Sequence, residues 1–210
     1  YIIFKKKLFL SNTGFIHQSY VNKPVPLTGG IFILLPAIYL FSSDYLFFIF
    51  AYFLLFLIGF FSDIKIFESA KKRFFIQFLV ILIFAYLSEL EVTPTKIDFF
   101  DEVIQGTFLS YLFTAFCLMI LINGSNFIDG LNGLLVGYFL LIALVLFKLD
   151  LISLMNFHDG RFIQFLFIIL FVLILNLGNR LFMGDSGAYS LSFLSGFLLI
   201  KIYNLNENIS

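Results

Sequence analysis

Residues 123–133 read NGSNFIDGLNG, and this polar, glycine-bearing stretch decides how the chain is organised. It separates two apolar runs, each close to the length of a membrane span. If the stretch is helical, the three-residue spacing of Asn126, Asp129 and Asn132 puts their side chains on one face. The pattern therefore predicts a polar ligand site where two spans meet water. A hydrophilic loop with turn glycines is the alternative interpretation.

The composition is that of a membrane protein. Apolar residues make up 61 % of the 210 residues and charged residues 12 %, whereas a soluble domain has roughly 25 % charged residues. We therefore predict an all-α, polytopic helical membrane protein. The formal net charge of zero argues against nucleic acid as a partner. The single cysteine, Cys117, excludes a disulfide framework.

Seven apolar segments predict about seven transmembrane helices, several of them shorter than the roughly 20 residues expected of a span. These segments are residues 29–41, 45–61, 74–87, 106–122, 134–147, 162–175 and 187–202. We predict one integral-membrane domain over residues 1–210. The chain opens with four apolar residues followed by Lys5, Lys6 and Lys7, which resembles the tail of a preceding span. We therefore expect a fragment that lacks most of its first span.

The basic residues are divided unevenly between the two sides that seven spans define. Four of the thirteen Lys and Arg residues are on one side, namely Lys96, Lys148, Arg161 and Lys201. The other nine are on the same side as residues 123–133. Since Lys and Arg near span ends favour the cytoplasmic side, residues 123–133 are predicted to face the cytoplasm. Residues 5–28, 62–73 and 176–186 share that side. It also holds only four acids, three of them in glycine-bearing or span-end segments, which indicates a site.

Three of the charged positions on this side have a functional and a structural interpretation. Asp185 lies in the segment FMGDSG, where a hard oxygen ligand beside glycines suits Mg²⁺, while helix capping is the alternative. The positive N-terminal end of the span that follows would be directed toward an anion. Asp63 ends an apolar run, and a carboxylate deep in lipid costs roughly 2.5–3.5 kcal/mol, so it lies at the surface or is held by a cation. Lys65 and its basic neighbours are phosphate ligands or positive-inside anchors.

Four motifs taken together resemble one family. They are KPVPLTGG (23–30), FFSDIK (60–65) with AKKRFFIQ (70–77), NGSNFIDGLNGL (123–134) and FMGDSG (182–187). Their order and spacing are similar to the successive cytoplasmic motifs of the polyprenyl-phosphate N-acetylhexosamine-1-phosphate transferases, along nearly the whole chain. Each motif alone is weak, but four in register between spans are specific.

The resemblance implies an enzyme of the bacterial cytoplasmic (inner) membrane with its active site on the cytoplasmic face. Polyprenyl phosphate, undecaprenyl phosphate in bacteria, would attack the β-phosphate of a UDP-sugar and give polyprenyl-diphospho-sugar and UMP. Such a step initiates a cell-envelope glycan, for example in cell-wall or lipopolysaccharide synthesis. Mg²⁺ is the implied cofactor, with Mn²⁺ as a substitute, and a homodimer is an added expectation.

The same resemblance implies roles for individual residues. Asp63 and Asp129 would be catalytic, and Asp185 would be the metal ligand. Asp129 with Asn126 would also position the nucleotide-sugar and its diphosphate, and Phe182 would stack on uracil. The implied substrate-binding residues are Lys23, Lys65, Asn126, Asn132, Asn176 and Phe182.

Two positions depart from the family pattern. Ser62 stands where the family has the first carboxylate of an Asp-Asp pair, and Asn132 replaces the second acid of the D-G-x-D pattern. A His-containing loop expected later in this family lies beyond the last residue, so the C-terminal spans are also expected to be missing. The alternatives are a catalytically degenerate relative, indicated by Ser62, and a polytopic transporter, whose acids should lie near mid-span.

Overall fold

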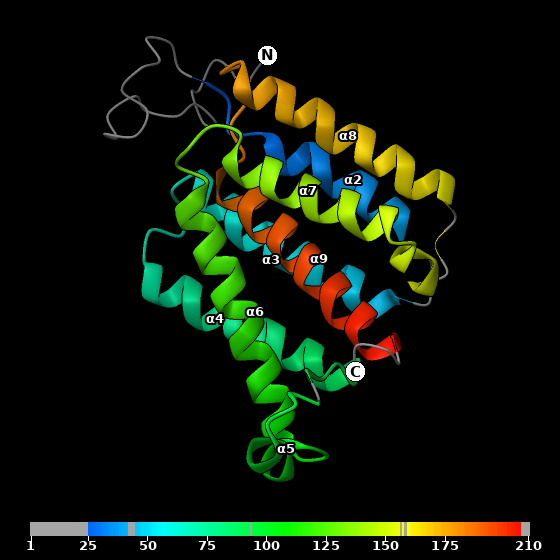
Figure 1. Cartoon of the computed structure of the whole chain (residues 1–210). Helices are drawn as coiled ribbons and strands as arrows, with labels where there is room; N and C mark the ends of the chain where they lie inside the picture. The colour runs from blue at the N-terminus through cyan, green and yellow to red at the C-terminus, as the bar shows by residue number, and fades with distance from the viewer. Residues whose placement is uncertain (1–24, 42–44, 93, 156, 158, 207–210) are drawn as a thin grey trace.

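The computed structural model describes residues 25–41, 45–92, 94–155, 157 and 159–206, and most of them are helical (Figure 1). The α-helices are α2 (Gly29–Leu40), α3 (Leu46–Asp63), α4 (Ala70–Leu87), α5 (Asp98–Ile104), α6 (Phe108–Ile128), α7 (Leu134–Lys148), α8 (Asp159–Leu177) and α9 (Gly184–Leu205). A short 3₁₀ helix, η3 (Leu151–Met155), links α7 to the segment before α8. The prediction of an all-α membrane protein is confirmed.

Each of the seven apolar segments forms a helix, and α5 is an additional short one. Four helices are long and apolar enough to cross a membrane by length and composition, namely α3, α6, α8 from Gly160, and α9. The apolar helices α2 and α7 are shorter. The protein is therefore a multi-pass membrane protein, and seven as the number of spans stays a prediction.

Several helices extend beyond the apolar segments that predicted them. The helix α4 begins at Ala70, four residues before its apolar run, because the hydroxyl of Ser69 accepts a hydrogen bond from the Lys72 N–H at 3.4 Å and caps it. The helix α6 continues to Ile128, so half of the stretch 123–133 is helical. Asp129 ends that helix and Asn132 lies in the turn that follows. The prediction that Asn126, Asp129 and Asn132 share one helical face is therefore wrong for Asn132.

The helix α9 lies at the centre of the bundle. It packs against α2, α3, α6 and α7, and most of its residues are buried. Small residues permit these close contacts, since without a side chain two helix backbones approach within van der Waals distance. A Cβ atom added at Gly59 in α3 would lie only 2.4 Å from the Cα of Ser186, and one at Gly30 in α2 would lie 2.7 Å from the Gly187 nitrogen. These contacts fix the position of the first turn of α9.

The contact between α3 and α9 gives a stability prediction. Gly59→Ala is expected to lower the free energy of unfolding by about 1–3 kcal/mol, because the new methyl group overlaps the backbone of Ser186. Gly124→Ala is the matched control, since a Cβ at Gly124 meets open space and alanine favours a helix by roughly 0.5–1 kcal/mol. Thermal unfolding of the detergent-purified variants measures both. Equal stability of the two variants would show that the helices do not pack as described.

Candidate active site

The described parts of the four motifs meet at one end of the bundle. The segment before α2 runs beside the segment before α9, with a parallel bridge between Leu27 and Phe182. The N–H of Phe182 donates to the Pro26 carbonyl, and the N–H of Gly29 donates to the Phe182 carbonyl, both at 3.0 Å. The first and fourth motifs are thus joined by backbone hydrogen bonds.

The third motif is joined to the end of α8 and the loop after it through Asn176 and Asn179. The amide of Asn132 donates to the Asn179 side chain. The oxygen of Asn176 accepts a hydrogen bond from the Gly133 N–H, and its amide nitrogen donates to the Leu181 carbonyl at 2.9 Å. Asn176 is buried, so it holds the two loops together. The predicted contact of Asn132 and Asn176 with substrate stays a prediction.

Asn176 also gives a testable stability effect. Asn176→Ala is expected to cost about 2 kcal/mol, because the half-buried N–H of Gly133 and the buried carbonyl of Leu181 lose their partner. Asn123→Ala is the control, since among the described residues the Asn123 amide donates only to the Met119 carbonyl of its own helix, at 2.9 Å. Chemical denaturation of both variants in the same detergent measures the difference. A loss at Asn123 as large as at Asn176 would contradict the bridging role.

Asp63 binds the first turn of α9. One carboxylate oxygen accepts the N–H of Asp185 at 2.8 Å, and the other accepts the N–H and the hydroxyl of Ser186 at 3.1 and 2.7 Å. Gly184 has a φ of 68°, and a Cβ atom there would lie 2.7 Å from the Asp63 carboxylate. Asp63 is therefore a helix-capping group that sets the position of Asp185. Its predicted catalytic role stays a prediction.

The carboxylate of Asp185 has its own partners on α3 and α4. The hydroxyl of Ser62 donates to Asp185 Oδ2 at 2.5 Å, and the guanidinium of Arg73 donates to both Ser62 and Asp185. Arg73 and Asp185 thus form an ion pair, and their side chains are 20 % and 24 % exposed. Ser62, which replaces the first acid of the family pair, is a hydrogen-bond donor to the predicted metal ligand.

Asp129 completes the cluster from the end of α6. Its carboxylate lies beside the backbone N–H of Gly184. Burial raises the pKa of the Asp129 carboxyl well above its ordinary value, and the negative charges of Asp185 and Asp63 raise it further. Three carboxyl groups therefore lie around the single guanidinium of Arg73, and a bound cation would relieve the repulsion between their negative charges. The cluster is therefore a cation-attracting site.

The N-terminal N–H groups of α9 were expected to bind an anionic ligand. In the structure a carboxylate of the protein accepts two of them, since the N–H groups of Asp185 and Ser186 donate to Asp63. A negative side chain at a helix N-terminus satisfies these groups and the helix dipole without a ligand, so binding of a further anion at this helix end stays a prediction.

The charge of the cluster suits a divalent cation, but its side chains are not arranged as a metal centre. Within the described residues, no group of three or more His, Cys, Asp or Glu side chains is placed to hold a metal ion. Every hydrogen bond that the Asp185 side chain accepts from the described residues goes to Oδ2. The other oxygen, Oδ1, accepts none of these bonds. Carboxylate oxygens are the ligands that Mg²⁺ prefers, usually one or two of them with water and phosphate. Asp185 and Asp129 fit that requirement.

The remaining predicted substrate-binding residues differ in their exposure. Lys23 lies outside the described residues. Lys65 is exposed in the turn after α3, with a φ of 61°, and Asn126 is half-buried in the last turn of α6. The Phe182 ring is buried, with 6 % of its surface exposed, so stacking on uracil requires that it first be uncovered. The substrate roles of these residues stay predictions.

The pairing of Arg73 with Asp185 is not predicted by the sequence motifs. Arg73 was grouped with Lys65, Lys71 and Lys72 as a phosphate ligand or a positive-inside anchor, yet it alone of these four forms an ion pair with a described residue. Its Nε is buried and has no hydrogen-bond partner among the described residues. The sequence does contain an indication of this contact. Arg73 lies in the first turn of the helix that follows the predicted catalytic loop, and a residue in that position lies near the loop.

The fold and this cluster define a class of protein: a helical multi-pass membrane protein with a polar, carboxylate-lined site at one end of its spans. A family model described as glycosyl transferase family 4 matches residues 45–203, most of the chain. The chain belongs to this family, that of the polyprenyl-phosphate hexosamine-1-phosphate transferases. A comparison with curated proteins finds no match.

Proposed function

We propose that the protein transfers a sugar-1-phosphate, N-acetylhexosamine-1-phosphate in the simplest case, from a UDP-sugar to a membrane polyprenyl phosphate and releases UMP. The observation that carries the proposal is the convergence of Asp63, Asp129, Asp185 and Arg73 at one end of the spans. There a soluble nucleotide and a lipid phosphate can both reach the same charges. Family membership supports the reaction class.

Asp185 and Asp129 would hold the Mg²⁺ ion. The ion supplies neutralisation of the charge that develops on the diphosphate, which is the main demand of phosphoryl transfer. Asp63 holds the first turn of α9 so that Asp185 keeps its position. The unpaired Nε of Arg73 is a suitable donor to a phosphate oxygen, since a buried N–H without an acceptor costs about 1–3 kcal/mol.

The reaction does not require a general base at position 62. A phosphate monoester with a second pKa near 6 is largely dianionic at neutral pH, so the lipid phosphate already carries the attacking lone pair. Its oxygen forms a bond to the β-phosphorus as the bond to the UMP oxygen breaks. Ser62 keeps Asp185 and Arg73 in place through its two hydrogen bonds. This account favours an active enzyme over a degenerate relative.

A transporter is the alternative from another class. Its acids should lie near mid-span along a substrate path. The three acids of the candidate active site lie instead at helix ends. Asp63 is the last residue of α3, Asp129 follows α6, and Asp185 is in the first turn of α9. Their position at one end of the bundle supports chemistry at a membrane surface.

The proposed orientation places this end in the bacterial cytoplasm and gives a labelling prediction. In a Cys117→Ala background, single cysteines at Ser69 and Asn179, both exposed near the site, are expected to react only with reagents that reach the cytoplasm. A cysteine at Glu102, exposed at the opposite end, should react in intact cells. Labelling of Asn179 and Glu102 from the same side would disprove the arrangement.

The direct test is a substrate panel. Membranes containing the full-length protein are incubated with polyprenyl phosphate and radiolabelled UDP-GlcNAc, UDP-GalNAc or UDP-MurNAc-peptide, and the lipid fraction is counted. We expect label in the lipid from one of these donors in the presence of Mg²⁺, and none after chelation. No lipid-linked product from any UDP-sugar would reject the proposal and favour a degenerate relative.

A further inference from the structure

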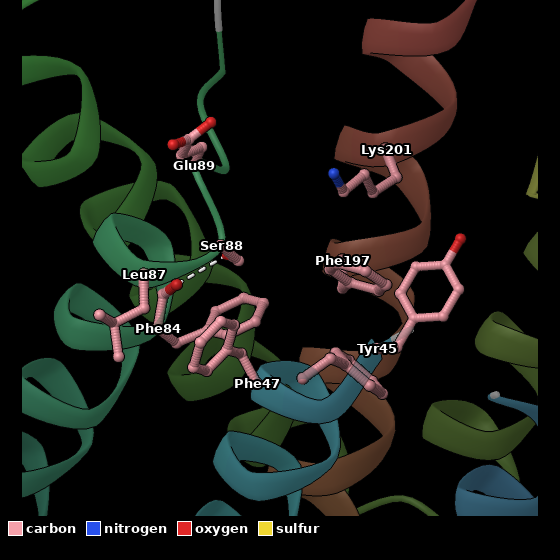
Figure 2. A pocket seen from close by; sticks show the side chains of 9 residues that line it. Tyr45, Phe47, Phe84, Leu87, Ser88, Glu89, Phe197 and Lys201 are labelled. Carbon is pink, nitrogen blue, oxygen red and sulfur yellow. Dashed lines mark hydrogen bonds between the residues drawn. The ribbon is translucent and has the colours of Figure 1, made fainter. Parts of the chain in front are cut away.

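A cavity lies at the end of the bundle opposite the candidate active site (Figure 2). It has a volume of about 290 Å³ and lies between the start of α3, the end of α4 and the last turns of α9. Phe47, Phe84 and Phe197 contribute to its apolar wall, while Glu89 and Lys201 stand on opposite sides of its opening. Small-molecule sites begin at roughly 300 Å³, so the cavity has room for a small polar group.

The cavity lies at the level of lipid headgroups. The helix α3 runs from Leu46, next to the cavity, to Asp63 in the candidate active site. Eighteen helical residues span about 27 Å, close to the roughly 30 Å of a hydrocarbon core. The cavity and the candidate active site therefore face opposite leaflets, so a ligand of the cavity is not the substrate phosphate. This inference depends on the membrane fold and not on the proposed reaction.

An apolar groove continues from the cavity along the lipid-facing side of α3 and α4. A smaller cavity of about 120 Å³ lies between these helices and shares Phe47, Phe84 and Leu87 with the larger one. Phe47, Ile83 and Leu87 are 49, 57 and 48 % exposed, as expected for side chains that meet lipid tails. A hydrocarbon chain can therefore lie in the groove while its headgroup occupies the larger cavity.

The two charges at the opening are available to a ligand. Neither Glu89 nor Lys201 forms an ion pair with any residue in the described part of the chain. Glu89 has a φ of 48° in the turn that ends α4, where the Leu90 N–H donates to the Ala85 carbonyl at 2.9 Å. Glycine is the residue that such a helix end favours. The backbone geometry at the end of α4 therefore does not explain why residue 89 is a glutamate.

We propose that the cavity binds a zwitterionic phospholipid with a primary ammonium in its headgroup, of the ethanolamine type. The phosphate would pair with Lys201, the ammonium would donate hydrogen bonds to Glu89, and one acyl chain would lie in the groove between α3 and α4. A headgroup with no cation is disfavoured, since Glu89 would gain no partner. A quaternary ammonium has no N–H to donate to Glu89.

Native mass spectrometry of the purified full chain tests the proposal with lipids of identical acyl chains and ethanolamine, choline or glycerol headgroups. We expect the ethanolamine lipid to bind about threefold to tenfold more strongly than the other two. Glu89→Gln should remove this preference, and Lys201→Gln should weaken binding of all three. Glu102→Gln and Lys148→Gln, exposed positions away from the cavity, are the matched controls and should keep it.

A third variant separates binding from folding. Glu89→Gly is expected to unfold at the same or a higher temperature than the wild type, because glycine suits the φ of 48°, and yet to lose the preference for ethanolamine. Equal binding of all three lipids by the wild type would overturn the proposal. So would a preference that persists in Glu89→Gln. Sugar-phosphate transfer need not be measured, so these outcomes do not depend on the proposed reaction.

Discussion

Replacing Asp185 by asparagine is expected to lower sugar-phosphate transfer by roughly a hundredfold to a thousandfold while the protein stays folded. Loss of one charge-stabilising group in an active site typically costs about 10² to 10³ in rate, and a neutral amide oxygen is a poor ligand for a hard dication. Asparagine keeps the shape of the side chain and can still accept from Arg73 and Ser62. The fold should therefore tolerate the change, because the ion pair it removes is partly exposed.

Two measurements check this prediction. The first is lipid-linked product formed by the full-length variant, with Asp98→Asn, an exposed aspartate far from the site, as the control for loss of a carboxylate. The second is the rise in unfolding temperature on adding Mg²⁺, which should be present in the wild type and much smaller in Asp185→Asn. Near-normal turnover, or an unchanged Mg²⁺ effect, would remove Asp185 as the metal ligand.

Asp63→Asn is expected to cost far more activity than Ser62→Ala. Asp63 accepts three hydrogen bonds from the first turn of α9, whereas Ser62 contributes one donor to Asp185. An asparagine at position 63 keeps one acceptor oxygen but replaces the other with an amide nitrogen, which cannot accept from Ser186. The position of Asp185 should change as a result. We expect a loss of about 10² or more for Asp63→Asn and less than about tenfold for Ser62→Ala.

Ser62→Asp distinguishes an adapted enzyme from one that has lost its base. General-base catalysis is worth about 10² to 10⁴ in rate, so an enzyme that merely lost its base should regain much of that factor. We expect little gain or a loss, because a third carboxylate beside Asp63 and Asp185 repels the lipid phosphate. The measurement is product formation from about pH 6 to about pH 8. A strong gain in Ser62→Asp would contradict the account.

The sequence was sufficient to predict that the seven apolar segments become helices and that the polar motifs gather at one end of the bundle, but it did not predict the short helix α5. Long apolar runs leave few alternatives to a membrane helix, and glycine-bearing stretches between them mark the ends. The helix boundaries were less predictable, because α4 continues through Lys71, Lys72 and Arg73 and α6 through Asn126. Hydropathy marks where lipid ends, while helices end where capping groups are available.

The contacts inside the candidate site were not predictable from the motifs. Asp63 binds α9, Arg73 pairs with Asp185, and Asn176 joins two loops. Each pairing joins residues from different helices, and its geometry depends on how closely α3, α4 and α9 pack. That packing in turn depends on Gly59 and Gly30, whose importance appears only when the opposing backbone of α9 is placed. The motifs predicted the residue types at the site and left their hydrogen-bond partners open.

The central claim is transfer of a sugar together with its phosphate, and a doubly labelled donor tests it most directly. A UDP-sugar carrying a radioactive β-phosphate and a tritiated sugar is incubated with the full-length protein, polyprenyl phosphate and Mg²⁺. The account predicts that both labels enter the lipid in the ratio of the donor, with UMP as the soluble product. Entry of the sugar label alone, with UDP released, would contradict it.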